Sequence, residues 1–194
     1  MRTHPAFLCH PGFMFDPNAY GEEVARILAL DGSGQRLMPL DGRRCSSGTT
    51  VELLGQVEAL RLFPASRAPE AAVAGLYLYF SCWDQAHTAA QGIHTIEGSY
   101  WHALVHRQEP DAANSAYWFR KVGAHPVFPE LRERAAALRL EVRDRWDPFA
   151  FLEFCEQARN QPGSELERQA REVQLAEWQL LFDYCAGAGS QSTY

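Results

Sequence analysis

Apolar residues recur at helical spacing along most of the chain. In the segment from Ala19 to Leu30, for example, Val24, Ile27 and Leu28 fall on one helical face. Similar apolar stripes, bounded by capping residues and by glycine or proline, predict helices over seven further segments. These segments are 50–62, 70–91, 99–109, 111–123, 130–142, 148–161 and 164–184.

The segment 70–91 has no polar face. Its only formal charges are Glu70 and Asp84, and the remaining positions are mostly small, apolar or aromatic. A helix that is apolar all round is buried on every side. The pattern therefore predicts a central helix around which the others pack.

Together these segments predict an all-α fold. We expect a single compact domain over residues 1–194, a bundle of seven or eight helices joined by short links. Residues 1–18 carry three prolines and three phenylalanines without periodicity, which predicts an extended strap docked by its aromatic side chains. Residues 186–194 are expected to fray. A short hairpin containing residues 35–40 is a weaker expectation, because Pro39 disfavours a strand.

Composition narrows the classes of partner. Apolar residues make up 46% of the 194, enough for a sizeable core, and the net charge is −6. An acidic chain without a basic patch argues against nucleic acid and against anionic membranes as partners. No apolar run approaches the roughly 20 residues that a membrane span requires.

The five cysteines are widely spaced, odd in number and form no C-x-x-C pair. This pattern favours neither a disulfide framework nor a thiolate zinc site. Cys82, Cys155 and Cys185 lie in apolar stretches, where a thiol behaves as a small hydrophobe. We therefore expect a reducing, cytoplasmic location.

Candidate chemistry is concentrated between Asp84 and His125. His102 and His106 are four residues apart in HALVH, so both imidazoles project from one helical face. The same spacing predicts an amphipathic helix with its histidines on the polar side. It resembles the H-E-x-x-H pattern of zinc proteases, but Ala103 stands where the general base would be, which excludes that reading.

Asp84 and His87 form a D-x-x-H pair on the preceding predicted helix. A mononuclear site would join His102 and His106 to a third ligand from this pair, or from His94 or Glu97. Zinc, iron or manganese would suit such nitrogen and oxygen ligands. The alternative is structural: a solvent-exposed histidine pair, and a hydrogen bond between Asp84 and His87.

A metal-free pocket is the competing interpretation of the same segment. Apolar walls with a few convergent polar groups are typical of small-molecule sites. The candidate ligand-binding residues are Asn114, Tyr117, Trp118, Arg120 and His125. Here too a structural role is open, with Asp111 and Gly123 as helix caps and Arg107 paired with Asp111 or Glu109.

The segment GSYWHALVHRQEPDAANSAYWFRKVGAHP, residues 98–126, resembles part of an uncharacterised family of helical proteins from bacteria and fungi. The shared pattern is GSYWH-x-x-x-HR-x-EPD-x-x-N-x-x-YWFR-x-x-G-x-HP. The likeness covers about thirty residues and implies no activity, substrate or cofactor.

Three functions stay open. The first is an enzyme, such as a metal-assisted hydrolase or oxygenase, with Glu97 or Glu109 as general base and Arg107 or Arg120 as an anion clamp. The second is a small-molecule binding module without chemistry. The third is an interaction scaffold, for instance a homo-oligomer, although no heptad repeat indicates a coiled coil.

Overall fold

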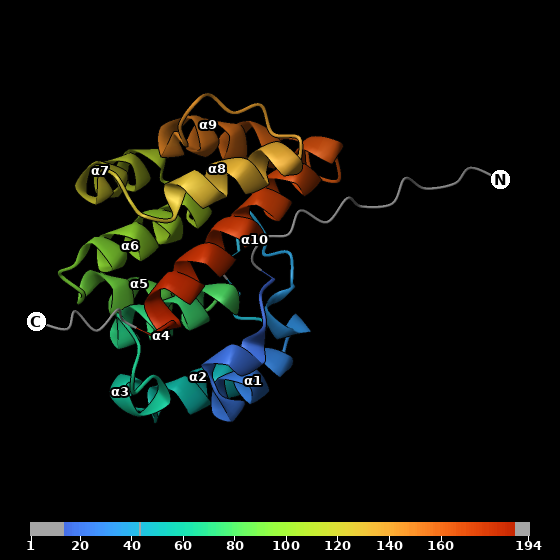
Figure 1. The fold of residues 1–194 in the computed structure, drawn as a ribbon. Helices are drawn as coiled ribbons and strands as arrows, with labels where there is room; N and C mark the ends of the chain where they lie inside the picture. Colours follow the sequence, from blue (N-terminus) through green and yellow to red (C-terminus); the bar gives the residue numbers. More distant parts are fainter. Residues whose placement is uncertain (1–13, 43, 189–194) are drawn as a thin grey trace, which may run out of the picture.

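The structure is a computed structural model that describes residues 14–42 and 44–188. Within these ranges it contains ten α-helices, two short 3-10 helices and no β-strand, which confirms the predicted all-α class (Figure 1). Most of the strap and of the tail, residues 1–13 and 189–194, lie outside the described residues. None of the described helices combines the length and apolarity needed to cross a bilayer.

The helices are short except for the last one. In chain order they are η1 (Pro17–Tyr20), α1 (Glu22–Ala29), η2 (Gly32–Gly34), α2 (Gly48–Gly55), α3 (Ala59–Leu62), α4 (Pro69–Tyr79), α5 (Trp83–Gln91), α6 (Ile96–Gln108), α7 (Ala112–Val122), α8 (Phe128–Ala137), α9 (Pro148–Arg159) and α10 (Glu165–Ala186).

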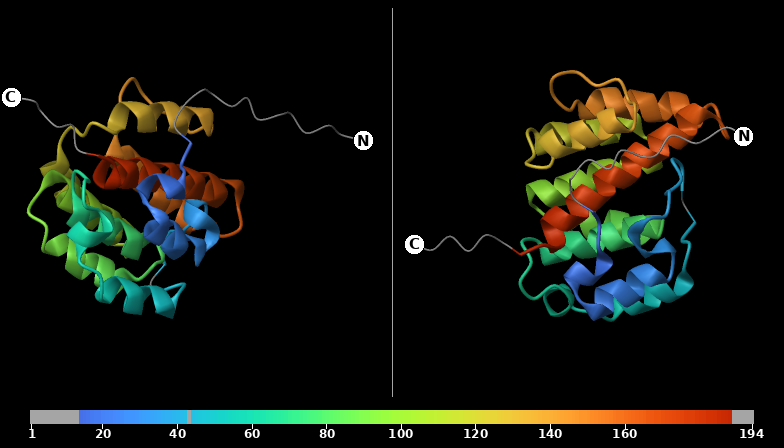
Figure 2. Two further views of the ribbon diagram at one scale, coloured as in Figure 1. Left: turned by 60° about the horizontal axis from the view of Figure 1, so that its bottom comes forward. Right: turned by 45° about the vertical axis from the view of Figure 1, so that its right-hand side comes forward.

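Helices α4, α5, α6 and α7 pack one on the next in chain order, and α10 crosses them diagonally (Figure 1). Helix α10 contacts α4, α8 and α9. Helices α1 to α3 lie at one end of the molecule, while α8 and α9 lie at the other (Figure 2). The long helix therefore connects the two ends across the central stack.

Helix α6 is buried on every side, which contradicts the amphipathic helix expected from its sequence. All residues from Tyr100 to Gln108 are buried, including both histidines, Arg107 and Gln108. Neighbouring helices on several sides enclose its polar groups. Helix α4 is largely buried as predicted, and Gly75 allows the Trp101 ring of α6 to approach its backbone, since a Cβ there would lie 2.7 Å from that ring.

The predicted central helix over 70–91 is broken into α4 and α5. Ser81, between them, adopts a left-handed conformation with φ of 57°, which stops α4 and redirects the chain. The segment contains no proline and no glycine at this point, so nothing in the local sequence signals the break.

Other boundaries also shift. The predicted helix over 50–62 divides into α2 and α3, and no strand forms over residues 35–40. Thr95, rather than Ser99, caps α6 by accepting a hydrogen bond from the Gly98 amide at 3.2 Å. The expected caps Asp111 and Ser164 are confirmed, as is the end of α7 at Gly123, where φ is +60°.

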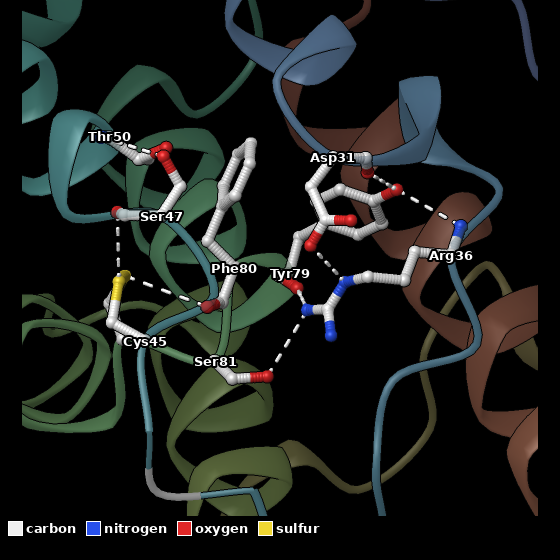
Figure 3. The surroundings of a disulfide bond; sticks show 9 residues. Asp31, Arg36, Cys45, Ser47, Thr50, Tyr79, Phe80 and Ser81 are labelled. Carbon is white, nitrogen blue, oxygen red and sulfur yellow. Dashed lines mark hydrogen bonds and ion pairs between the residues drawn. A yellow bond between two sulfur atoms is a disulfide. The ribbon is translucent and has the colours of Figure 1, made fainter.

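A disulfide joins Cys45, in the segment before α2, to Cys82, between α4 and α5 (Figure 3). The expectation that the cysteines form no disulfide is therefore wrong for this pair. Widely spaced cysteines give no sign of which two will meet, because the fold brings them together across 37 positions. Cys155 and Cys185 are buried free thiols.

Beside the disulfide, Arg36 ties the η2 segment to the end of α4 (Figure 3). Its Nε lies 2.8 Å from an Asp31 carboxylate oxygen, and its Nη2 donates to the Ser81 hydroxyl at 3.1 Å. The Tyr79 hydroxyl accepts from the Arg36 amide at 3.0 Å and donates to the Asp31 carbonyl. The disulfide and this ion pair together hold the left-handed turn at Ser81.

Reduction should destabilise this end of the molecule. Opening a loop of 37 residues is expected to lower the free energy of unfolding by about 4 kcal/mol through the gain in unfolded-state entropy. Urea denaturation with and without dithiothreitol measures the difference. A Cys45→Ala/Cys82→Ala variant should show no response to the reductant, and equal stability of the reduced and oxidised wild type would contradict the prediction.

Candidate functional site

Three imidazoles meet where α5 packs on α6. His87 comes from α5, and His102 and His106 come from successive turns of α6. The Nε2 atoms of His87 and His102 lie 3.1 Å apart, and the rings of His102 and His106 are stacked with centroids 4.8 Å apart. One ring nitrogen from each histidine lies within 4.8 Å of the others. We call these three residues the histidine cluster.

Two tryptophans clamp the histidine cluster. Trp83 stacks on His87 from one turn earlier in α5, with centroids 5.1 Å apart, and its Nε1 donates to the Val105 carbonyl at 3.2 Å. Trp118, from α7, stacks on His102 with centroids 4.0 Å apart. These contacts fix the ring planes before any ligand binds, which is the preorganisation that a binding site requires.

The three histidines differ in exposure. His102 and His106 are buried, whereas His87 is half-buried. Near it lies Lys121, an exposed residue of α7, whose ammonium sits 4.2 Å from the ring centre of Trp118 and 4.7 Å from that of Tyr117.

The environment keeps the imidazoles of His102 and His87 neutral. Burial lowers the pKa of His102 to about 4, and positive charge on His106, His87 and Lys121 would lower it further. Burial, with the neighbouring His106, also lowers the pKa of His87, and Glu109 and Asp84 oppose this shift. At neutral pH both rings are unprotonated and can offer lone pairs to an electrophile.

Glu109 lies directly behind His106. Its carboxylate oxygen is 3.1 Å from Nδ1 of His106, so a proton on Nδ1 is held by Glu109 and the Nε2 lone pair is left available. Asp111 completes a second close group with these two residues, and its carboxylate also accepts from Asn114. A carboxylate behind a histidine is the arrangement that orients metal ligands.

The separations within the cluster can be compared with those of a metal site. Two nitrogens at 2.0–2.1 Å from a tetrahedral zinc ion are about 3.3 Å apart. The 3.1 Å between Nε2 of His87 and Nε2 of His102 is close to this value and is also the length of a hydrogen bond between the two rings, while the nitrogen of His106 lies within 4.8 Å of both. Of the residues the structure describes, the cluster thus brings together three of the four predicted metal ligands.

The structure does not bring the other predicted ligands into the cluster. Asp84 is exposed on α5 and lines a separate cavity of about 320 Å³ with Tyr77. His94 is exposed beyond the end of α5. Glu97, in the first turn of α6, acts electrostatically on His125 instead.

Arg107, predicted as a catalytic residue or as a partner of Asp111 or Glu109, pairs with a different residue. Its Nη2 donates to Glu177 of α10 at 2.6 Å, and both side chains are completely buried. The Tyr100 hydroxyl donates to the other Glu177 oxygen at 2.9 Å. Burial opposes the charge of Arg107, but Glu177 outweighs it and raises the pKa of the guanidinium.

The predicted ligand-binding residues are divided between two places. Trp118 stacks on His102 of the histidine cluster, and the exposed Tyr117 lies beside Trp118. Asn114 is exposed and bonded to Asp111. Arg120 and His125 line a separate cavity between α7, α8 and the segment that precedes α9.

The sequence did not predict a role for three residues that contact the candidate site residues: Trp83, Lys121 and Glu177. Trp83 lies four positions before His87, and that helical spacing could have shown its stacking. Glu177 interrupts an apolar stretch of α10, which is the signal of a buried charge.

Comparison with protein families, curated proteins and solved structures finds no match to this chain, so the resemblance of residues 98–126 stays a prediction.

Glu177→Gln should strongly destabilise the fold. It leaves the Arg107 charge buried without a counter-ion, which is expected to lower the free energy of unfolding by about 3–5 kcal/mol. Urea denaturation measures the loss, with Glu165→Gln on the exposed first turn of the same helix as the control. A Glu177→Gln protein as stable as the control would show that the pair contributes nothing.

The stability of the metal-free protein should fall in acid. The pKa of His102 is about 4 in the fold against 6.5 for the free side chain. As the pH falls through 6.5 the unfolded chain therefore takes up a proton that the folded chain does not, and stability is lost between pH 6.5 and 4. From pH 7 to pH 5 this loss is about 2 kcal/mol for one such histidine.

Urea denaturation at both pH values, in the presence of a chelator, checks this dependence. The free energy of unfolding of His102→Gln should differ less between pH 7 and pH 5 than that of the wild type, by the same amount of about 2 kcal/mol. His94→Gln should show the same difference as the wild type. An undiminished difference in His102→Gln would mean that His102 titrates normally.

Proposed function

We propose that the histidine cluster binds one divalent metal ion, preferably zinc, and that the protein is a metal-dependent hydrolase of small molecules. The observation that carries this proposal is the convergence of three ring nitrogens, one from each histidine, within 4.8 Å of one another. Three histidines with an open fourth position are the ligand set of catalytic zinc sites, where the metal activates a bound water.

The burial of the cluster supports the same conclusion. The lowered pKa values of His87 and His102 keep both rings unprotonated at neutral pH, so a metal ion need not compete with protons for them. Zinc, which tolerates all-nitrogen sites, suits this donor set better than manganese, which prefers oxygen. Iron(II) also accepts imidazole, and metal analysis distinguishes the two.

Glu109 is the carboxylate we assign to this site. It holds His106 by its Nδ1 and is only partly exposed, so it would orient this ligand from the side of the ring opposite to a metal ion at Nε2. Glu97 and Arg107 receive no role in the reaction, because one interacts with His125 and the other is enclosed in the core.

The predictions of substrate class, cellular location and oligomeric state are also parts of this proposal. The substrate is a small molecule, and the acidic chain argues against nucleic acid. The cytoplasmic location rested on the absence of disulfides, and the bond between Cys45 and Cys82 removes part of that basis, since disulfides are typical of oxidising compartments. A homo-oligomeric assembly stays a prediction.

Metal binding can be measured directly. Protein purified without an affinity tag or chelator should contain close to one equivalent of zinc by mass spectrometry, and isothermal titration of the metal-free protein should show one site. His102→Gln and His106→Gln should each weaken zinc binding by more than about 100-fold, the upper end of the effect of losing an outer-sphere partner. Absence of binding to a folded wild-type protein would refute the proposal.

Two matched variants sharpen this result. His94→Gln removes an exposed histidine outside the cluster and should leave zinc affinity unchanged. Glu109→Gln should weaken zinc binding by about 10–100-fold, because the amide orients His106 less well. Equal affinities in all variants would show that the metal is held elsewhere.

Catalysis needs a separate measurement. The zinc-loaded protein should hydrolyse an activated ester such as p-nitrophenyl acetate, and His102→Gln should not. If zinc binds with the predicted dependence on the histidines but hydrolysis is absent, the cluster is a metal-binding module without this chemistry.

A further inference from the structure

The largest described cavity lies away from the histidine cluster. It has a volume of about 1000 Å³ and is formed by the end of α7, the start of α8 and the segment that leads into α9. Its apolar wall is aromatic and consists of Phe119, Phe128, Trp146 and Phe149. A cavity of this size and lining accommodates a ligand with a flat apolar body.

The rim of the cavity is rich in arginine. Arg120, Arg143 and Arg145 are exposed and line it, and within the described residues none of their guanidinium groups has an ion-pair partner. Three acids are also present. Glu133 binds Arg132, and Asp147 caps α9.

Asp144 is the third acid, and it has no hydrogen bond or ion pair among the described residues. The lining holds four arginines and three acids, a net formal charge of +1, so it favours an anionic group over a cationic one.

Two buried N–H groups in the same lining also lack acceptors. His125 accepts from the Val127 amide through Nδ1 at 3.3 Å, so in the neutral ring the proton lies on Nε2, and burial keeps the ring neutral by lowering its pKa to about 4. Within the described residues neither this Nε2 nor Nε1 of Trp146 has a hydrogen-bond partner. Both side chains are more than nine-tenths buried.

Unmatched buried donors are costly unless an acceptor is supplied. Three arginines of the lining have no ion-pair partner among the described residues, and two buried N–H donors of its residues are unpaired there. A carboxylate provides acceptor capacity only, so it complements this set, and an aromatic body complements the Phe and Trp wall.

We propose that the cavity between α7, α8 and the segment before α9 is a binding site for an aromatic carboxylate. The carboxylate would lie at the arginine rim and the ring against the aromatic wall. The site shares no lining residue with the histidine cluster. It is therefore independent of the proposed metal centre, and failure of one proposal leaves the other intact.

Isothermal titration with indole-3-acetate tests the proposal on the full-length protein. One molecule should bind per chain, and the uncharged indole-3-acetamide should bind at least about 10-fold more weakly, because it lacks the charge-assisted hydrogen bonds. Arg120→Gln and Arg145→Gln should each weaken indole-3-acetate binding by about 5–10-fold. Both residues are exposed, so these variants should fold.

Two controls locate the binding. Arg61→Gln removes an exposed arginine of α3, far along the chain from the cavity, and should leave the affinity unchanged. His102→Gln should also bind indole-3-acetate as the wild type does. Lack of binding, equal binding of acid and amide, or equal weakening by Arg61→Gln would each overturn the proposal.

Discussion

The buried ion pair between Arg107 and Glu177 is the constraint on which the rest of the structure depends. It joins the most enclosed helix, α6, to the long diagonal helix, α10, with Tyr100 completing the contact. The ring of Phe151 lies 4.8 Å from the guanidinium carbon, so α9 is held at the same point. A slip of α6 by one residue would separate these charges, and the pair therefore fixes the rotation of α6. The same rotation turns His102 and His106 toward α5.

Local sequence patterns predicted much of the fold. Helical periodicity predicted the class and most of the elements, and caps such as Asp111 and Ser164 marked the correct ends, because both signals act within a few residues. The break at Ser81 and the disulfide between Cys45 and Cys82 were missed. Both depend on contacts between segments far apart in the chain, which periodicity does not encode.

In the candidate site, too, local spacing predicted some features, whereas others depend on contacts between distant segments. The spacing of His102 and His106 predicted that both project from one face of the helix, and His87 was among the ligands proposed from the neighbouring helix. Spacing could not show that Asp84 is exposed and lines another cavity, or that Arg107 has its counter-ion on α10. The expected amphipathic face of α6 was wrong because burial there is decided by what packs on the helix rather than by its own polarity.

Lys121 gives the molecule an unusual chemical property. It is the only lysine in the chain, and it is exposed on α7 over the ring of Trp118, which in turn stacks on His102. Apart from the chain's own α-amino group, amine-directed reagents therefore have a single point of attachment. A fluorescent dye conjugated to Lys121 would lie near the imidazoles. A change in its fluorescence would report ligand binding at the histidines, without any engineered residue.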